Sequence, residues 1–213
     1  MTEDHADGAT PDKRPPLPTP WPDLDEVLSL RPGRLAGLGI YPDSREAEAG
    51  YLLAVHAAVH GEQVLYAAPD APPRPQVPGL QHCTTSPLDI DRLKALVASS
   101  RAPIGLVVVD HLQLLRPGPG EAPIHEPEQA EELGVQLKRM AMGEGGRMRA
   151  VVALAHYRRR GTQPDINDLG LAAELEYHAD CVVLLERPAP GRIEAYIAKD
   201  RTGPALRSIV IAG

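Results

Sequence analysis

The stretch IGLVVVDHLQLL at residues 104–115 decides the fold of this chain. It is a short valine-rich run that ends in Asp110, and such runs are typical of strands buried on both faces of a sheet. Similar runs alternate with helical patterns along the chain: strands at 34–40, 63–68 and 149–156, and helices at 44–60, 88–100 and 127–142. Because parallel strands need helical crossovers, this alternation predicts a three-layer α/β/α sandwich with a mostly parallel sheet.

The two ends of the chain differ from this pattern. The last three strands, at 181–186, 192–199 and 207–212, follow one another without helices, which predicts an antiparallel edge. Residues 1–20 contain five prolines and mixed charge, so we expect a disordered arm there and one domain over 21–213. Asp23 and Ser44 are the expected caps of the first two helices.

The composition limits the classes of function. Acidic residues outnumber basic ones 29 to 22, giving a net charge of −7, which argues against a basic nucleic-acid clamp. Two cysteines are too few for a disulfide framework or a cysteine-based zinc site. There is no apolar run of about 18 residues and no signal peptide, so a soluble, cytoplasmic protein without a membrane partner is expected.

Asp110 is the first candidate site residue. A carboxylate after a buried strand is where P-loop NTPases hold the magnesium of a nucleotide, although the same position also suits a turn or a cap. His111 and His156 are a second candidate, a metal-binding pair. The spacing of the sequence supplies no third ligand for that pair, which favours an ordinary structural role for both.

Six segments resemble, in the same order, the C-terminal domain of DnaB-type hexameric replicative helicases. They are LPTPWPDLDEVLSLRPGRL (17–35), QVLYAAPD (63–70), the 104–115 stretch, VVALAHYRR (151–159), INDLGLAAELEYHADCVVLLER (166–187) and AYIAKDRTGP (195–204). The resemblance implies a RecA-like P-loop NTPase fold over about residues 17–212. It also implies oligomers with nucleotide sites between subunits.

The resemblance assigns roles to several residues. Asp70 stands at the place of the family's catalytic glutamate, and His156 stands where the family carries a glutamine. Asp110 matches the magnesium-binding aspartate. Lys199 and Arg201 match residues that reach into the nucleotide site of a neighbouring subunit, where an arginine stabilises the transition state.

The phosphate loop departs from the family pattern. In GIYPDSREAEAG (39–50), Pro42 fits, but Arg45, Glu46 and Ala47 occupy the Gly-Lys-Thr positions. Glu46 replaces an attraction for phosphate of up to ~4 kcal/mol by a comparable repulsion. Ala47 lacks the hydroxyl that would bind magnesium. We therefore expect no cofactor, and ATP with magnesium only if the atypical loop still binds them.

Basic residues cluster near the end of the chain's middle third, while the preceding loop is acidic. The loop 116–132 carries one arginine and five glutamates, which would repel DNA. The basic cluster is a predicted patch for nucleic acid or an acidic partner, with a solvated surface as the alternative: Arg147, Arg149, Arg158, Arg159 and Arg160.

Three functions remain open from the sequence. The favoured one is a DnaB-like pseudo-ATPase that acts through protein contacts in DNA replication or repair, with a helicase-like subunit or a second copy as its partner. The first alternative is an active ATP-dependent DNA helicase or DNA-stimulated ATPase with an atypical phosphate loop. The second is a scaffold or regulatory protein unrelated to replication.

Overall fold

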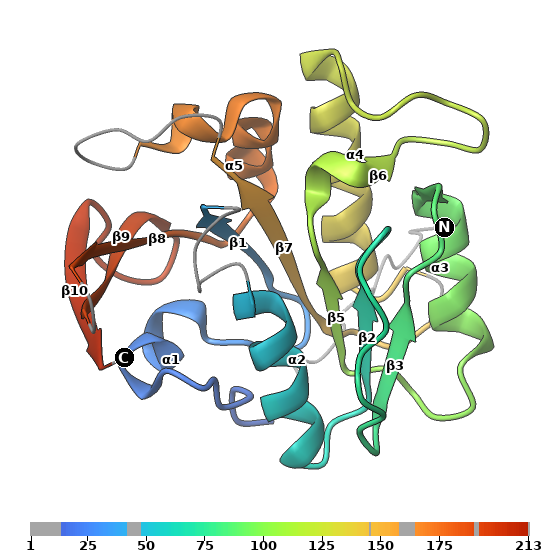
Figure 1. Cartoon of the computed structure of the whole chain (residues 1–213), viewed down its shortest axis with the longest axis horizontal. Helices are drawn as coiled ribbons and strands as arrows, with labels where there is room; N and C mark the ends of the chain where they lie inside the picture. Colours follow the sequence, from blue (N-terminus) through green and yellow to red (C-terminus); the bar gives the residue numbers. More distant parts are fainter. Residues whose placement is uncertain (1–13, 42–47, 145, 158–164, 190–191, 213) are drawn as a thin grey trace, which may run out of the picture.

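The sheet is the centre of the molecule. The structure, a computed structural model, describes residues 14–41, 48–144, 146–157, 165–189 and 192–212. Within them, eight strands form one sheet in the order β10-β9-β8-β1-β7-β5-β2-β3 (Figure 1). Their bounds are β1 Leu35–Ile40, β2 Val64–Ala67, β3 Leu80–Cys83, β5 Leu106–Val109, β7 Ala150–His156, β8 Cys181–Ala189, β9 Arg192–Asp200 and β10 Arg207–Ala212. A separate small pair joins β4, Leu88–Asp89, to β6, Leu115–Arg116.

The directions of the strands follow the prediction. The strands from β3 through β2, β5, β7 and β1 to β8 are all parallel neighbours. β9 pairs antiparallel with both β8 and β10. The mostly parallel sheet and its antiparallel C-terminal edge are therefore confirmed.

Helices cover both faces of the sheet and give the predicted three layers. They are α1 Pro22–Leu28, α2 Ala49–Val59, α3 Ile90–Ser99, α4 Pro127–Ala141 and α5 Leu175–His178, with the 3-10 helices η2 Leu112–Leu114 and η3 Ile166–Glu174. Alternate residues of the central strands face opposite cores, since Val108 packs with α1 and α2 whereas Val107 packs with α3 and α4. Every residue of β5 is buried, as its valine run predicts.

The beginning of the domain differs from the prediction in two details. α1 starts at Pro22 with Trp21 at the cap position, so Asp23 lies in the first turn and is not the cap. Proline suits this first helical position because the amide hydrogen that it lacks would have no partner there. Before residue 21, where the domain is predicted to begin, Leu17 already pairs with Leu30, and Thr19 is buried.

No helix in the described part of the chain is both long enough and apolar enough to cross a bilayer. α4, with 15 residues, carries charges along its exposed face.

Candidate functional site at the carboxyl ends of the strands

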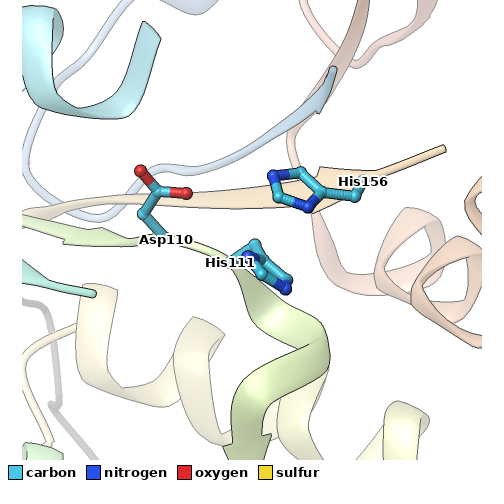
Figure 2. Close-up of side chains that lie close together, drawn as sticks. All are labelled: Asp110, His111 and His156. Carbon is cyan, nitrogen blue, oxygen red and sulfur yellow. The ribbon is translucent and has the colours of Figure 1, made fainter. Parts of the chain in front are cut away.

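The polar residues Asp110, His111 and His156 meet where two neighbouring parallel strands end. Asp110 and His111 follow β5, and His156 is the last residue of β7. Figure 2 shows the carboxylate beside the two imidazoles, and the ligand atoms of all three side chains lie within 4.8 Å of one another. The two rings are stacked, with 3.8 Å between their centroids and 28° between their planes. Such strand ends are where open α/β sheets place their ligands.

Asp110 is held from the next strand. The hydroxyl of Tyr66, on β2, donates a hydrogen bond of 2.6 Å to Oδ2 of Asp110. Burial raises the pKa of Asp110, and this hydrogen bond opposes part of the rise. Burial and the nearby carboxylate of Asp110 raise the pKa of Tyr66, so Tyr66 stays protonated and remains a donor. One carboxylate oxygen is therefore already bound within the chain.

Gly50 lets the first turn of α2 lie directly against Asp110. A Cβ atom at this position would lie 2.8 Å from Oδ2 of Asp110 and 3.0 Å from the Leu154 side chain. Only a residue without a side chain fits so close an approach of helix and carboxylate.

Gln113 fixes the second strand end. Its Nε2 donates to the carbonyl of His156 at 2.9 Å, and its Oε1 accepts from the amide of His156 at 3.2 Å. Burial, followed by the proximity of His156, lowers the pKa of His111 to about 4, so this imidazole is neutral near pH 7. The sequence places Gln113 in a recognisable motif, but its contact with β7 depends on the pairing of the strands.

The start of α2 carries an ion pair that the sequence does not predict. Glu48, at the cap position of α2, lies 2.8 Å from Arg74, whose guanidinium stacks on Tyr51 at 4.7 Å from the ring centroid. Glu48 also raises the pKa of Asp110 by charge repulsion, as a lesser cause than burial. A carboxylate at this end offsets the attraction of a helix N-terminus for anions.

The predicted phosphate-loop residues, Pro42, Arg45, Glu46 and Ala47, lie outside the described residues, as does the expected cap Ser44. Just before them, the ring of Tyr41 lies 4.4 Å from that of Tyr157. The hydroxyl of Tyr41 donates to Glu186 at 3.3 Å. This tyrosine therefore packs against residues that follow β7 and lie on β8.

Asp70 lies outside the three-residue cluster. It follows β2, as predicted, but its side chain is exposed and accepts a hydrogen bond of 3.0 Å from Ser86. Its backbone has a φ of 65°, in the left-handed region. Its predicted catalytic role stays a prediction.

Lys199 and Arg201 contact backbone carbonyls at the end of α5. Lys199 Nζ donates to the carbonyl of Glu176, and an Nη of Arg201 donates to that of Tyr177 at 2.9 Å. Cations are favourable at a helix C-terminus because the last carbonyls have no partner within the helix. Burial, followed by the charge of Arg201, lowers the pKa of Lys199. Within this chain, both side chains are thus engaged with α5.

The predicted basic patch does not form one surface around β7. Arg147 and Arg149 precede this strand and lie at the opposite end of it from His156. Arg149 is only 5% exposed, and its Nη2 donates to the carbonyl of Arg147 at 2.6 Å. With Arg101, the two line a pocket of about 210 Å³. The remaining members, Arg158, Arg159 and Arg160, lie outside the described residues.

The sheet order and the polar cluster at its strand ends define the chain as a RecA-like α/β domain. Its fold is similar to three solved structures: a helicase-like "ATPase Domain" (TM-score 0.75, covering 92% of this chain and 87% of that one), a "DnaB-Like Replicative Helicase" studied for "Its Interactions With Primase" (TM-score 0.74, 92% and 59%) and the "RadB recombinase" (TM-score 0.61, 91% and 94%). Each is 16% identical in sequence to this chain.

The sequence itself identifies the family. The family model "DnaB-like helicase C terminal domain" matches residues 81–211, and the chain therefore belongs to this family. No curated protein sequence matches the chain significantly. The predicted resemblance and the RecA-like fold are both confirmed.

Proposed function

We propose that this domain is a DnaB-like pseudo-ATPase, which does not hydrolyse ATP and acts through protein contacts in DNA replication or repair. The observation that carries the proposal is the state of Asp110, the only family magnesium ligand that the sequence retains. Its Oδ2 is bound to Tyr66 and lies against the first turn of α2. A magnesium–nucleotide complex would have to compete with these contacts.

Electrostatics support the same conclusion. Where the family places a lysine and a hydroxyl, this chain has Glu46 and Ala47, and Glu48 follows at the start of α2. Two carboxylates near the expected phosphate position repel the ligand, and the loss of the lysine removes the compensating charge. ATP and magnesium therefore do not fit the residues present.

Calorimetry with ATP and magnesium tests the proposal. We expect no binding by the natural chain up to millimolar ATP, and no phosphate release with or without single-stranded DNA. The matched variant is Arg45→Gly with Glu46→Lys and Ala47→Thr, which rebuilds the family pattern and should gain affinity. Micromolar binding or DNA-stimulated turnover by the natural chain would instead support the alternative, an active helicase.

For the partner, we propose a helicase-like subunit or a second copy of this chain. Lys199 and Arg201 match family residues that act across a subunit interface, and one similar structure concerns the interactions of a replicative helicase with primase. Light scattering measures self-association, and the ATPase rate of an intact DnaB-like ring, measured with increasing amounts of this domain, detects docking. A rate unchanged at saturation, with a monomeric domain, would favour a scaffold unrelated to replication.

A further inference from the structure

The cluster at the ends of β5 and β7 contains three metal-binding side chains. In sequence, His111 and His156 form a pair without a third ligand, but the adjacent strands bring Asp110 to within 4.8 Å of both. Two imidazoles and one carboxylate are the donor set of several catalytic zinc and non-haem iron sites. His156 replaces the glutamine that the resemblance implies, so one of these ligands is a departure from the family pattern.

We propose that Asp110, His111 and His156 bind one divalent transition metal of the zinc class, with at least one coordination position open to water or another ligand. The inference rests on the proposed function, because this metal would use the carboxylate that a magnesium–nucleotide complex needs. Imidazole nitrogen selects zinc and its neighbours over magnesium, which takes oxygen ligands in a near-ideal octahedron.

Modest rotations of the side chains complete the geometry. Ligands about 2.1 Å from a tetrahedral metal lie roughly 3.4 Å from one another, so atoms within 4.8 Å need to approach by at most about 1.4 Å. The imidazoles are stacked at 3.8 Å, and their nitrogen lone pairs converge only if the rings turn out of this stack. All three side chains are only partly buried, which leaves room for rotation and for a metal to enter.

Two positioning residues support the ligands from outside. Tyr66 donates to Oδ2 of Asp110 and leaves Oδ1 for the metal. Gln113 bonds to both backbone polar groups of His156, so the Cα of that ligand is fixed while its ring rotates. Hydrogen bonds of this kind orient metal ligands, and their loss typically costs roughly 10–100-fold in affinity.

The test is titration of the full chain, without a histidine tag, with Co²⁺ followed by visible absorption, and with Zn²⁺ against a chromophoric chelator. We expect one tightly bound metal per chain. Asp110→Asn, His111→Ala and His156→Ala should each weaken zinc binding more than about 100-fold, and Tyr66→Phe about 10-fold. The control is His60→Ala, since His56 and His60 form another close pair, with ring centroids 4.2 Å apart, on α2.

The outcomes separate the two proposals. No metal binding at micromolar concentrations, or equal binding by the His111→Ala/His156→Ala double variant, overturns the metal site and leaves the pseudo-ATPase proposal intact. Loss of binding in His60→Ala alone would move the metal to α2 and overturn the site as well. Binding of magnesium–ATP by the metal-free natural chain overturns the proposed function by a separate readout. Circular dichroism of each variant verifies that it is folded.

Discussion

At the scale of single residues, the hydrogen bond from Tyr66 to Asp110 is the contact on which the candidate site depends. A largely buried carboxylate needs a donor, because burial without a partner costs more than the bond itself contributes. Tyr66 is 2% exposed and its hydroxyl lies 2.6 Å from the carboxylate. The tyrosine is thus both a core residue and a positioning residue.

Replacement of Tyr66 by phenylalanine tests this contact. Tyr66→Phe should lower the free energy of unfolding by about 1.5–3 kcal/mol, the usual contribution of a hydrogen bond to a charged group. Urea unfolding in the presence of a chelator measures the change. Tyr51→Phe is the matched control, since the ring of Tyr51 lies 5.7 Å from that of Tyr66. Equal losses in the two variants would contradict the assigned role.

Arg149 is a buried charge in the opposite situation. It is 5% exposed, no carboxylate pairs with it among the described residues, and burial lowers its pKa. Because this lowered pKa reports an unfavourable charge in the folded state, Arg149→Met should raise the free energy of unfolding by about 1 kcal/mol. The contrast is Lys138→Met, which breaks the 2.7 Å pair with Asp180 and should be destabilising. Thermal unfolding of both variants gives the signs.

At the scale of elements, the register of α2 against the sheet depends on Gly50. In an exposed helix, alanine in place of glycine stabilises by roughly 0.5–1 kcal/mol. Gly50→Ala should instead destabilise by about 1–3 kcal/mol, because the new methyl group lies 2.8 Å from Asp110 and 3.0 Å from Leu154.

The control for Gly50 is Gly134 in α4. A Cβ there lies 2.7 Å from the Cδ2 atom of His178, which is part of a ring that can turn aside. Gly134→Ala should therefore remain within about 1 kcal/mol of the natural chain. Denaturant midpoints compare the two substitutions directly, and a larger loss in Gly134→Ala would be inconsistent with this packing.

The short helix α5 depends on a strand for its C-terminal contacts. Lys199 and Arg201, on and after β9, supply donors to the carbonyls of Glu176 and Tyr177. Lys199→Met should increase hydrogen exchange of the amides in 175–179 by about fivefold, corresponding to the ~1 kcal/mol net contribution of such a bond. Arg201→Met, at an exposed residue, should have a smaller effect. Unchanged exchange in Lys199→Met would indicate that its side chain is free to act elsewhere.

At the scale of the whole molecule, the net charge of −7 opposes binding to nucleic acid. Phosphate contacts require lysine and arginine, and the two described arginines of the predicted patch lie beyond the amino end of β7, one of them buried. Fluorescence anisotropy at physiological ionic strength should give a dissociation constant for single-stranded DNA weaker than about 10⁻⁴ M. Tight binding that falls steeply with salt would restore the predicted patch as a DNA site.

Much of the fold follows from local patterns. The valine runs of β5 and β7, the caps near α3 and α4 and the ordered motifs predict the sheet, its antiparallel edge and the family. The prediction is less accurate where local signals compete, as at the start of α1, where Pro22 begins the helix ahead of Asp23. Thr19 and Leu17 have the composition of an arm, yet they pack on the domain through contacts that no local pattern encodes.

The sequence by itself determined the layers of the molecule and the positions of its chemically active residues along the chain. Burial of alternating or continuous apolar runs depends on residue type and spacing, and these are local properties. The tertiary structure alone decided which of those residues meet. Asp110 joins His111 and His156 while Asp70 turns to Ser86, because the neighbours of a strand end are set by the order and register of strands that lie far apart in sequence.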